Sequence, residues 1–512
     1  MKILTGEQTR AWDKFTIENE PIESFDLMLR ASKYWMHKLR FQYLSYREQN
    51  IYILAGLGNN GGDALCIAKM LAERNYKVYV WVIWHGEKFT EETAKARYIL
   101  ETSTDIDIFD VTHTTQIPNI PADALIIDGI FGTGLTRPVT GWVADFFCKI
   151  NKLSNQVFAI DMPSGLLSDK ISEGNAVICA TETLTLEAPK LAFLLPENEK
   201  YVGNWKVIDV YLHPDFLFIN EFQYELITKD LVKKFIKKRP KFAHKGTFGH
   251  ALLIGGEYGK AGAILLAGKA CLKSGAGLLT IFAPCSAHTI LQTALPDAIF
   301  LADENEKYIT KDIQNTEKYQ AIGIGCGLGT NPDTKTWLEN FLIQNKNPLV
   351  LDADALNLIA EMGEKGLSLI PQNSILTPHP KEFDRLVGAS EDSLERLEKL
   401  KILAQKIKSI VLLKGHHTAI ATPEGRVYFN NTGNSAMAKG GSGDVLTGII
   451  TSLLAQGYTS WEASILGVYW HGHAGDNAKS SMSEVSVLAS DLIKFLGKSW
   501  RELQINDDVL PF

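Results

Sequence analysis

A glycine-rich segment that ends in an aspartate and runs into an apolar helix carries the clearest chemical signal in this sequence. It spans residues 434–446, with glycines at positions 440, 441 and 443 before Asp444. If the apolar run from Val445 is helical, the amides of Gly441 to Asp444 are directed from the helix N-terminus toward an anion. Asp444 can then accept a proton from a hydroxyl group. This arrangement suits transfer of a phosphoryl group from a nucleotide to an alcohol.

Three further loops in the second half of the chain follow strand-like runs and should open into the same cleft. They lie at residues 325–329, 377–383 and 414–418. A nucleotide could be met by a cation and backbone amides from Lys414, Gly415, His416, His417 and Thr418. His379 lies between two prolines and could hydrogen-bond a substrate, although a satisfied loop histidine explains it equally well.

Two aspartates, Asp352 and Asp354, end another strand-like run in this half. Their carboxylates could bind a magnesium ion or water. The same residue type also caps helices, so a purely structural role stays open.

The first half of the chain has three loops of its own, each directly after an apolar run: residues 58–63, 128–138 and 161–165. Because such loops meet at the carboxyl edge of an open parallel sheet, they should line one crevice. Glycines let a phosphate approach the amides of the first two loops, and Arg137 could add positive charge. One loop alone could be a tight turn, but the three together predict a site for a dinucleotide or another phosphorylated ligand.

Oxygen-bearing side chains recur across these three loops. The Asn60 amide, the Asp128 carboxylate and the Ser164 hydroxyl could join backbone carbonyls around a hard cation. The same residue types serve as hydrogen-bonded caps of turns, so both interpretations stand. Asp161, at a strand end, is the best candidate for acid or base catalysis, with a cap as its alternative.

Parallel sheets must position these loops. Strand-like runs alternate with helical patterns in the first half, which predicts a doubly wound α/β sheet. The runs lie at residues 51–55, 78–83, 124–128 and 157–161, with a helix at 63–74. The pattern breaks at residues 216–241, and a second series of strands follows at residues 250–255, 278–283, 321–324, 349–352, 374–377 and 410–414. We therefore expect two α/β domains, residues 1–217 and 218–512.

Length and composition restrict the possible functions. The chain has 512 residues, of which 45% are hydrophobic and 22% charged, as in globular enzymes of several domains. A net charge of -7 without a basic stripe argues against nucleic acid, and no stretch suits a membrane span or a signal sequence. The six cysteines lie among apolar or small neighbours, which predicts buried, reduced thiols and a cytoplasmic location.

Taken together, these motifs resemble those of the bifunctional NAD(P)H-hydrate repair enzymes over nearly the whole chain. The first half is similar to NAD(P)H-hydrate epimerase domains at residues 59–63, 132–135 and 161–165. The second half is similar to ADP-dependent (S)-NAD(P)H-hydrate dehydratases at residues 246–263, 377–380 and 440–446. The resemblance implies a Rossmann-like N-terminal domain and a ribokinase-like C-terminal domain.

The resemblance also implies the reaction. The substrate would be NADHX or NADPHX, the cofactor hydrated at its nicotinamide ring, and the first domain would interconvert the R and S forms with Asp161 handling a proton. In the second domain Asp444 would deprotonate the ring hydroxyl of the S form and ADP would phosphorylate it. Loss of phosphate would then regenerate NAD(P)H, with AMP as co-product. Because phosphate leaves more readily than hydroxide, a kinase-like site suits a dehydratase.

Ligand contacts follow from the same resemblance. Epimerase substrate contacts would be Asn59, Asn60, Gly61, Gly62, Asp63, Gly132, Thr133, Gly134, Leu135, Thr136, Arg137, Pro138 and Asp161. A potassium ion would bind Asn60, Asp128 and Ser164. Dehydratase substrate contacts would be Ala263, Gly327, His379 and Asp444, and ADP with magnesium would meet Lys414, Gly415, His416, His417, Thr418 and Gly443. We expect these small molecules and other copies of the chain as partners, with no nucleic acid and no membrane.

Two residues depart from the usual pattern of the family. Ala64 stands where the epimerase motif commonly continues with glycine, and Lys381 stands where glycine commonly follows His-Pro. Ala64 should be tolerated because it lies inside a helix, whereas Lys381 could add charge near a phosphate.

Two other interpretations compete with this one. A ribokinase-like small-molecule kinase fused to a regulatory nucleotide-binding domain predicts a stable phosphorylated product. A dinucleotide-sensing protein without activity predicts no turnover, and the presence of both Asp161 and Asp444 argues against it.

Overall fold

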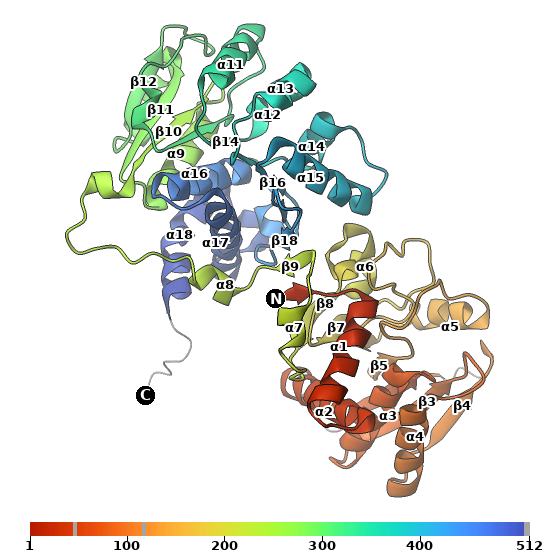
Figure 1. Cartoon of the computed structure of the whole chain (residues 1–512). Coiled ribbons are helices and arrows are strands. Elements are labelled where there is room, and N and C mark those ends of the chain that lie inside the picture. The colour runs from red at the N-terminus through yellow and green to blue at the C-terminus, as the bar shows by residue number, and fades with distance from the viewer. Residues whose placement is uncertain (45–48, 115–118, 506–512) are drawn as a thin grey trace. The chain divides into compact units, whose positions relative to one another are not determined.

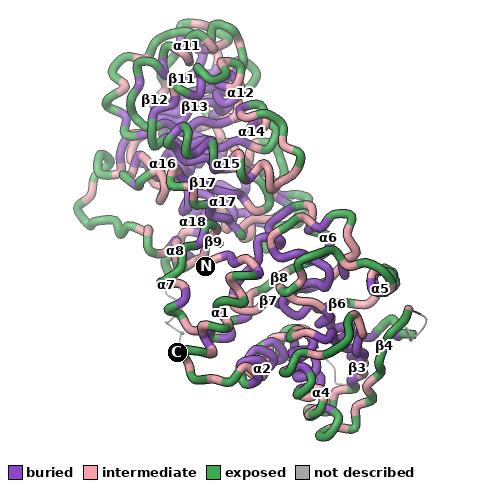
Figure 2. The backbone as a smooth tube through the Cα atoms, turned by 45° about the vertical axis from the view of Figure 1, so that its right-hand side comes forward, coloured by how far each residue is buried: buried purple, intermediate pink, exposed green. Residues whose placement is uncertain are grey.

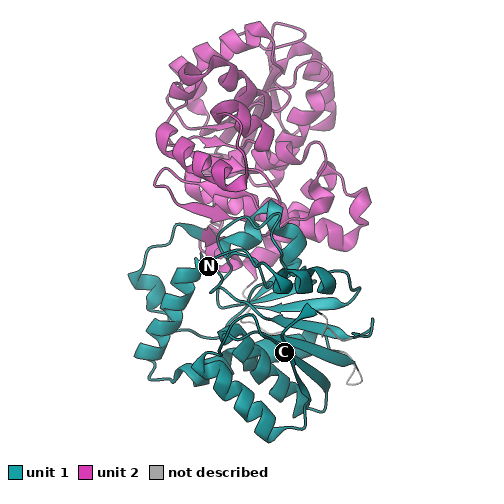
Figure 3. Cartoon of the chain, turned by 90° about the vertical axis from the view of Figure 1, so that its right-hand side faces the viewer, with its two compact units in different colours: residues 1–224 teal, residues 225–512 magenta. Residues whose placement is uncertain are grey.

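The structure is a computed structural model that describes residues 1–44, 49–114 and 119–505 (Figure 1). Buried residues gather in the strands of two separate sheets (Figure 2). The chain divides into two compact units, Met1–Tyr224 and Glu225–Phe512 (Figure 3). Each unit has its own sheet and is described by itself.

The first unit is built on a parallel sheet whose described strands have the order β4-β3-β2-β5-β6-β7-β8. These strands are β2 (Asn50–Ala55), β3 (Lys77–Ile83), β4 (Ile108–Val111), β5 (Leu125–Gly129), β6 (Gln156–Ile160), β7 (Glu182–Leu186) and β8 (Asn204–Ile208). The helices are α1 (Gly6–Asn19), α2 (Ser24–Gln42), α3 (Asn59–Ala72), α4 (Glu91–Ser103), α5 (Trp142–Ile150), α6 (Glu199–Val202) and α7 (Phe216–Ile219).

The centre of this sheet determines where a ligand can bind. β2 and β5 are almost wholly buried, as expected for strands covered on both faces. The strand order reverses between them, and Ala55 pairs with Gly129, so both strands end at the same level. A crevice opens outside the carboxyl ends of strands at such a reversal. The loops after β2 and β5 therefore flank one ligand site.

The N-terminal segment is fastened to this unit beside β7. Leu4 forms a parallel bridge with Lys190, and its amide donates to the Pro189 carbonyl at 3.3 Å. α1 follows at once, with a capping box in which the Thr5 hydroxyl and the Gln8 side chain each bond the other's amide. The first helix is thus held at both its entry and its cap.

The second unit is also built on a mostly parallel sheet. Its strands run in the order β9-β18-β17-β16-β15-β14-β13-β10-β11-β12, and only the β16–β17 and β17–β18 pairs are antiparallel among those with a described register. They are β9 (Tyr224–Leu226), β10 (His250–Ile254), β11 (Leu278–Pro284), β12 (Ile299–Asp303), β13 (Ala321–Ile324), β14 (Leu349–Leu351), β15 (Ile375–Leu376), β16 (Ile410–Leu413), β17 (Ala419–Ala421) and β18 (Val427–Phe429).

Helices cover this second sheet. They are α8 (Lys229–Lys233), α9 (Ala261–Lys273), α10 (His288–Ala294), α11 (Pro332–Gln344), α12 (Ala353–Met362), α13 (Glu364–Ser368), α14 (Pro380–Val387), α15 (Ser393–Ile407), α16 (Ser442–Ala455), α17 (Ser460–Ser481) and α18 (Ala489–Gln504). α16 packs closely on α9, because a Cβ at Gly448 would lie 2.1 Å from the Ala267 carbonyl oxygen. The strand order reverses between β10 and β13, where Ile254 pairs with Ile324, so a second crevice opens there.

The predicted α/β architecture is confirmed, and each predicted strand matches an observed strand to within one residue at either end. Strands such as β7 and β8 were missed, because polar side chains interrupt their apolar pattern. The predicted helix at residues 63–74 begins earlier, at Asn59. All six cysteines are free, but the prediction that they are buried is wrong for the exposed Cys148 and only partly right for Cys179 and Cys285. Among the described residues, no helix combines the length and apolar character needed to span a bilayer.

Two candidate active sites

A cavity of about 570 Å³ opens at the carboxyl ends of β2, β5 and β6 in the first unit. Its walls include these residues predicted to bind substrate: Asn59, Asn60, Asp63, Gly132, Thr133, Gly134, Leu135, Thr136, Arg137 and Asp161. Gly61, Gly62 and Pro138 are not among its lining residues. α1 supplies a further wall through Thr9, Arg10 and Asp13.

The segment at residues 58–63, expected as a loop, is the first turn of α3. The amides of Gly61 and Gly62 donate to the Gly58 carbonyl at 2.8 and 3.2 Å, so they are used inside the helix. A Cβ at Gly61 would lie 2.0 Å from the Gly56 carbonyl oxygen. Gly61 is therefore required for the close packing of α3 on the strand end rather than for direct contact with a phosphate.

Other amides around the cavity are available to an anion. Those of Asn59 and Asn60, at the N-terminus of α3, have no acceptor among the residues that the structure describes. The loop after β5 is fastened to α1, because the Arg10 guanidinium donates to the Thr133 carbonyl at 3.2 Å. Arg137 lies exposed at the rim. A helix N-terminus and an arginine at one cavity suit a phosphorylated ligand.

The three predicted cation ligands form one buried network. The Ser164 hydroxyl and amide donate to the two Asp128 oxygens at 2.5 and 2.7 Å. The Phe131 amide donates to Ser164 Oγ at 2.8 Å, and the Asn60 amide group donates to the Phe131 carbonyl at 3.0 Å. Asp128 is fully buried without a basic partner in the described part of the chain, and burial raises its pKa to about 6. The charge of such a buried carboxylate is one that a hard cation bound among these oxygen atoms can balance.

Asp161 is held in a strained and fully anchored position after β6. Its φ of 62° is left-handed, which costs a residue with a Cβ about 1–2 kcal/mol. Its Oδ1 accepts hydrogen bonds from Thr185 Oγ1 and the Leu186 amide, both at 3.0 Å, and pairs with the buried Lys190. No described residue hydrogen-bonds Oδ2, so that atom is available to a ligand in the cavity.

The partners of Asp161 were missed at the sequence level. Lys190 follows β7, which the apolar pattern did not reveal. Lys190 is fully buried, and its ammonium also donates to Thr185 Oγ1 at 2.7 Å and the Leu186 carbonyl at 3.2 Å. A lysine directly before the apolar run at residues 191–195 was the available signal, since a buried charge needs a partner.

In the second unit, α16 begins at the glycine-rich segment. Gly441 is its N-cap, with a φ of 91°. The amides of Gly441, Gly443 and Asp444 have no acceptor among the residues described, as expected for the first turn of a helix. They are available to an anion bound at the end of the sheet.

Asp444 lies half-buried in the first turn of α16, beside the ends of β13 and β14. Burial raises its pKa to about 6. The carboxylate of Asp352 raises this pKa further, whereas a hydrogen bond from the Cys326 thiol and the charge of Lys414 lower it. A carboxylate with this pKa is ionised at neutral pH and can accept a proton.

Asp352 and Lys414 form a buried pair next to Asp444. The Lys414 ammonium donates to Asp352 Oδ1 at 2.8 Å and lies 3.9 Å from Glu382 Oε2. The Thr447 hydroxyl donates to Asp352 Oδ2 at 2.7 Å. Burial disfavours the charge of Lys414, but the two carboxylates outweigh it and its pKa is raised. The Asp352 side chain therefore binds a cationic group, and although Asp352 is the N-cap residue of α12, its carboxylate makes no capping hydrogen bond.

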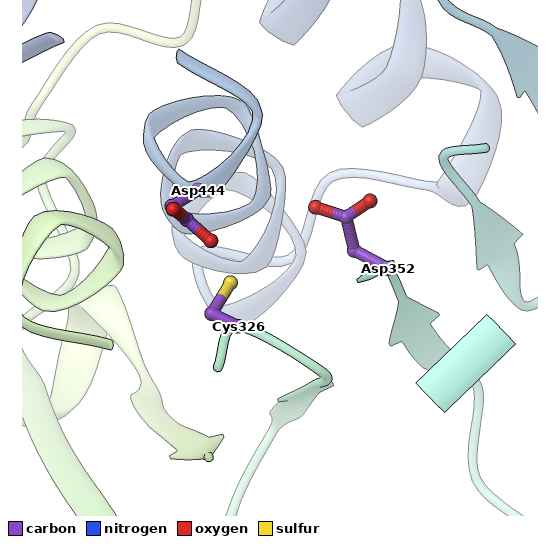
Figure 4. A group of neighbouring side chains, drawn as sticks. All are labelled: Cys326, Asp352 and Asp444. Atoms are coloured by element: carbon purple, nitrogen blue, oxygen red, sulfur yellow. The ribbon is translucent and has the colours of Figure 1, made fainter. Parts of the chain in front are cut away.

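Cys326 Sγ and one oxygen each of Asp352 and Asp444 lie within 4.8 Å of one another (Figure 4). This group does not fit magnesium, which demands oxygen ligands in an octahedral arrangement. Both Asp352 oxygens are already hydrogen-bonded, and burial raises the pKa of the Cys326 thiol well above its usual range. The protonated thiol instead points toward Asp444 as a hydrogen-bond donor.

The loop after β13 brings two of the predicted substrate contacts together. Gly325, Gly327 and Gly329 all have positive φ, between 60 and 131°. A Cβ at Gly327 would lie 3.2 Å from the Ala263 Cβ, so Gly327 and Ala263 are neighbours. Glycine is required here because the chain turns in the left-handed region while it touches α9.

His379 is the N-cap of α14 rather than a free loop histidine. Its Nδ1 accepts hydrogen bonds from the amides of Lys381 and Glu382 at 3.1 and 3.3 Å. Its Nε2 lies 3.4 Å from Glu382 Oε1, and 45% of its side chain is exposed. The ring is thus fixed in place with one nitrogen near solvent.

The loop at residues 414–418 joins β16 to the antiparallel part of the sheet. The Lys414 amide donates to the Pro378 carbonyl at 2.9 Å, which ties this loop to the one that carries His379. Gly415 and His416 are exposed, whereas Thr418 is buried. Burial lowers the pKa of His417 to about 4, so its ring is neutral.

Both departures from the family pattern are accommodated. Ala64 is fully buried in α3, and a Cβ at Gly129 would lie 2.6 Å from its methyl group. The strand therefore carries the glycine that lets Ala64 fit. Lys381 is exposed in the first turn of α14, where its side chain is free to approach a bound anion.

These two sites define the chain as an α/β protein with a dinucleotide-type crevice in one unit and a kinase-like phosphoryl-transfer site in the other. Models of known families match both: an NAD(P)H-hydrate dehydratase model at residues 251–498 and the YjeF-related protein N-terminus at residues 24–192. The chain belongs to the family of bifunctional NAD(P)H-hydrate repair enzymes.

Individual relatives support this assignment. A bifunctional NAD(P)H-hydrate repair enzyme of Moorella thermoacetica is 32% identical over 98% of this chain and 97% of its own length. The enzyme of the same name from Escherichia coli is 31% identical over 92% of this chain and 88% of its own length. A solved ADP/ATP-dependent NAD(P)H-hydrate dehydratase from Bacillus subtilis, co-crystallised with ATP and Mg2+, covers 55% of this chain and 98% of its own, with 33% identity and a TM-score of 0.50.

Proposed function

We propose that this chain repairs hydrated nicotinamide cofactors by two activities. Residues 1–217 interconvert the R and S forms of NADHX and NADPHX, and residues 218–512 dehydrate the S form with ADP. The boundary between the two compact units lies a few residues further along the chain, between Tyr224 and Glu225. The observation that carries the proposal is Asp444, ionised at neutral pH beside helix amides that have no acceptor in the described chain.

In the dehydratase site, Asp444 accepts the proton of the ring hydroxyl, and the hydroxyl oxygen attacks the terminal phosphorus of ADP. AMP leaves with the electron pair of the broken bond. Phosphate charge would be met by the Lys414 ammonium and by the amides of Gly441 and Gly443, which have no acceptor in the described chain. Elimination of phosphate from the ring then restores NAD(P)H. Lys414, Gly415, His416, His417 and Thr418 supply the remaining nucleotide contacts, and Ala263, Gly327 and His379 those to the hydrate.

Two metal ions belong to the proposal. Magnesium accompanies the nucleotide and neutralises phosphate charge, as suggested by the Bacillus subtilis dehydratase crystallised with ATP and Mg2+. The group at Cys326 does not suit it, so we place it on the phosphates. Asn60, Asp128 and Ser164 would hold a potassium ion, which would supply positive charge beside the epimerase substrate. The buried carboxylate of Asp128, which has no basic partner in the described chain, supports that site.

A cytoplasmic location and a homo-oligomer complete the proposal. The six free thiols are in keeping with a reducing compartment. Light scattering of the purified chain would test the assembly, and fluorescence microscopy of a tagged chain would test the location.

The test follows absorbance at 340 nm while the purified chain acts on an R/S mixture of NADHX with ADP and magnesium, with AMP and phosphate assayed at the end. Complete recovery of NADH with matching AMP is the expected result. Recovery that stops when the S form is used up would remove the epimerase activity. A phosphorylated product that keeps its phosphate would favour the small-molecule kinase fused to a regulatory domain.

A further inference from the structure

A second carboxyl group, that of Asp13, shares the cavity of the first unit with Asp161. Asp13 lies on α1, one helical turn after Thr9, and both residues line the cavity. The helix cannot turn away, because the neighbouring Trp12 is buried and its Nε1 donates to the His213 carbonyl at 2.8 Å. Thr16 Oγ1 accepts a hydrogen bond from the His213 amide at 3.0 Å. Asp13 is therefore held at the cavity wall.

The two carboxyl groups differ in their partners. All the hydrogen bonds of Asp161 fall on Oδ1, which also pairs with Lys190. Within the described chain, Asp13 makes no hydrogen bond and no ion pair, although its side chain is partly buried and lines the cavity. Nothing in the fold requires an acidic side chain at this position. An unpartnered carboxyl group at a ligand cavity points to a role toward the ligand.

The charges around Asp13 favour its protonated form. Burial raises its pKa to about 7, and the carboxylates of Asp161 and Glu187 raise it further, while Lys190 opposes them. Asp63 on α3 interacts with both Asp13 and Asp161 and itself has a pKa raised well above its usual range by burial. Asp63, however, already accepts a hydrogen bond from the Ser32 hydroxyl at 3.0 Å. Both groups line the cavity, and of the two Asp13 is the one without a hydrogen-bond partner in the described chain.

We propose that Asp13 is the general acid of the epimerase site and works against Asp161 as the base. This inference rests on the proposed function. Two carboxyl groups whose surroundings separate their protonation states are the usual signature of an acid and base pair. The inference adds a second catalytic residue to the epimerase. This residue lies on α1, whereas the motifs found in the sequence follow the strands of the sheet.

The chemistry of the substrate needs such a pair. Hydration of an enamine adds a hydroxyl group to the double-bond carbon attached to nitrogen and a proton to the other carbon of the double bond. To invert that carbon, Asp161 takes the hydroxyl proton, the carbonyl bond forms, and the carbon–nitrogen bond breaks with its electron pair on nitrogen. Asp13 gives its proton to that nitrogen. After rotation the nitrogen attacks the other face of the carbonyl, and both protons return to their donors.

The experiment compares Asp13→Asn with a matched control, Glu18→Gln, an exposed carboxylate on the same helix. Conversion of R-NADHX to the S form is followed by chromatography between pH 5.5 and 9, with an enzyme-free blank, and dehydration of pure S-NADHX is measured in the same samples. We expect Asp13→Asn to lower the epimerase turnover at least about 100-fold and leave dehydration unchanged. The control and the wild-type chain should keep full epimerase turnover, with a decline above pH 7.

Each outcome bears on the inference. Epimerase turnover of Asp13→Asn within about threefold of the wild type, with the decline above pH 7 intact, would overturn it. So would a loss that appears only in the KM for the hydrate, since that is the mark of a binding residue. If the wild-type chain itself fails to interconvert the two forms, that result refutes the proposed epimerase function, and the assignment of Asp13 is refuted as a consequence. Equal melting temperatures of the variants exclude a folding defect.

Discussion

The hydrogen bond from the Cys326 thiol to Asp444 gives the dehydratase a pH dependence that can be moved by one substitution. Asp444 has a pKa of about 6, above its ordinary value, so it is ionised above that pH and protonated below it. Only the ionised form can accept the substrate proton. The dehydration rate should therefore decline below pH 6, by tenfold for each further pH unit.

Cys326→Ala removes a donor that stabilises the ionised form. A single hydrogen bond contributes about 0.5–1.5 kcal/mol, and 1.36 kcal/mol corresponds to one pH unit, so the decline should move upward by roughly 0.4–1 unit. At pH 5.5 this makes the variant about two- to eightfold slower than the wild type, whereas at pH 8 the two differ little. The direction is fixed, because loss of a donor to a carboxylate raises its pKa.

The assay measures kcat/KM for pure S-NADHX with saturating ADP and magnesium between pH 4.5 and 8.5. Cys326→Ser is the matched control, since its hydroxyl keeps a donor at the same position and should hold the profile near that of the wild type. Melting temperatures monitor the small cavity left by alanine. A profile of Cys326→Ala that coincides with the wild type, or moves to lower pH, would refute the view that this thiol holds Asp444 in its ionised form.

Three other predictions follow from the two sites. Asp444→Asn should abolish dehydration while R/S interconversion survives, and Asp161→Asn should do the reverse; loss of both activities in either variant, measured on separated hydrates, would contradict two independent sites. Lys190→Met should destabilise the first unit by about 3–5 kcal/mol in urea titrations, because it strands the buried charge of Asp161, and Lys152→Met, at an exposed lysine, should cost little. Ser164→Ala should raise the KCl concentration needed for half-maximal epimerase activity about tenfold, with choline chloride as the ionic control, and an unchanged KCl dependence would remove the potassium site from this network.

The sequence predicted the elements well where apolar runs are continuous. β2, β5, β10 and β13 are buried on both faces, so their composition alone marks them, and the loops that follow carry most of the candidate residues. β7 was missed because threonine and glutamate alternate with its leucines. For the same reason the sequence did not reveal Lys190, which follows β7 and pairs with Asp161. Spacing along the chain does not report a contact between residues so far apart.

The candidate sites show the same division between local and long-range information. The N-terminus of α16 could be predicted from the glycines before Asp444, since a glycine-rich turn and an apolar helix are local features. The thiol of Cys326 and the carboxyl of Asp13 gave no signal, because a lone cysteine or a helical aspartate is ordinary until the fold places it beside a candidate catalytic carboxylate. Gly61 illustrates the opposite error, since a glycine expected to admit a phosphate is required for helix packing.

The bridge between Leu4 and Lys190 has a practical consequence for anyone who produces this protein. The lysine that pairs with Asp161 is bridged by Leu4, only a few residues from the first methionine. An affinity tag fused there, or removal of the first five residues, would disturb the segment that positions Lys190 and, through it, Asp161. A tag after Phe512 avoids that hazard, and a preparation with good dehydratase but poor epimerase activity should first be checked for a modified N-terminus.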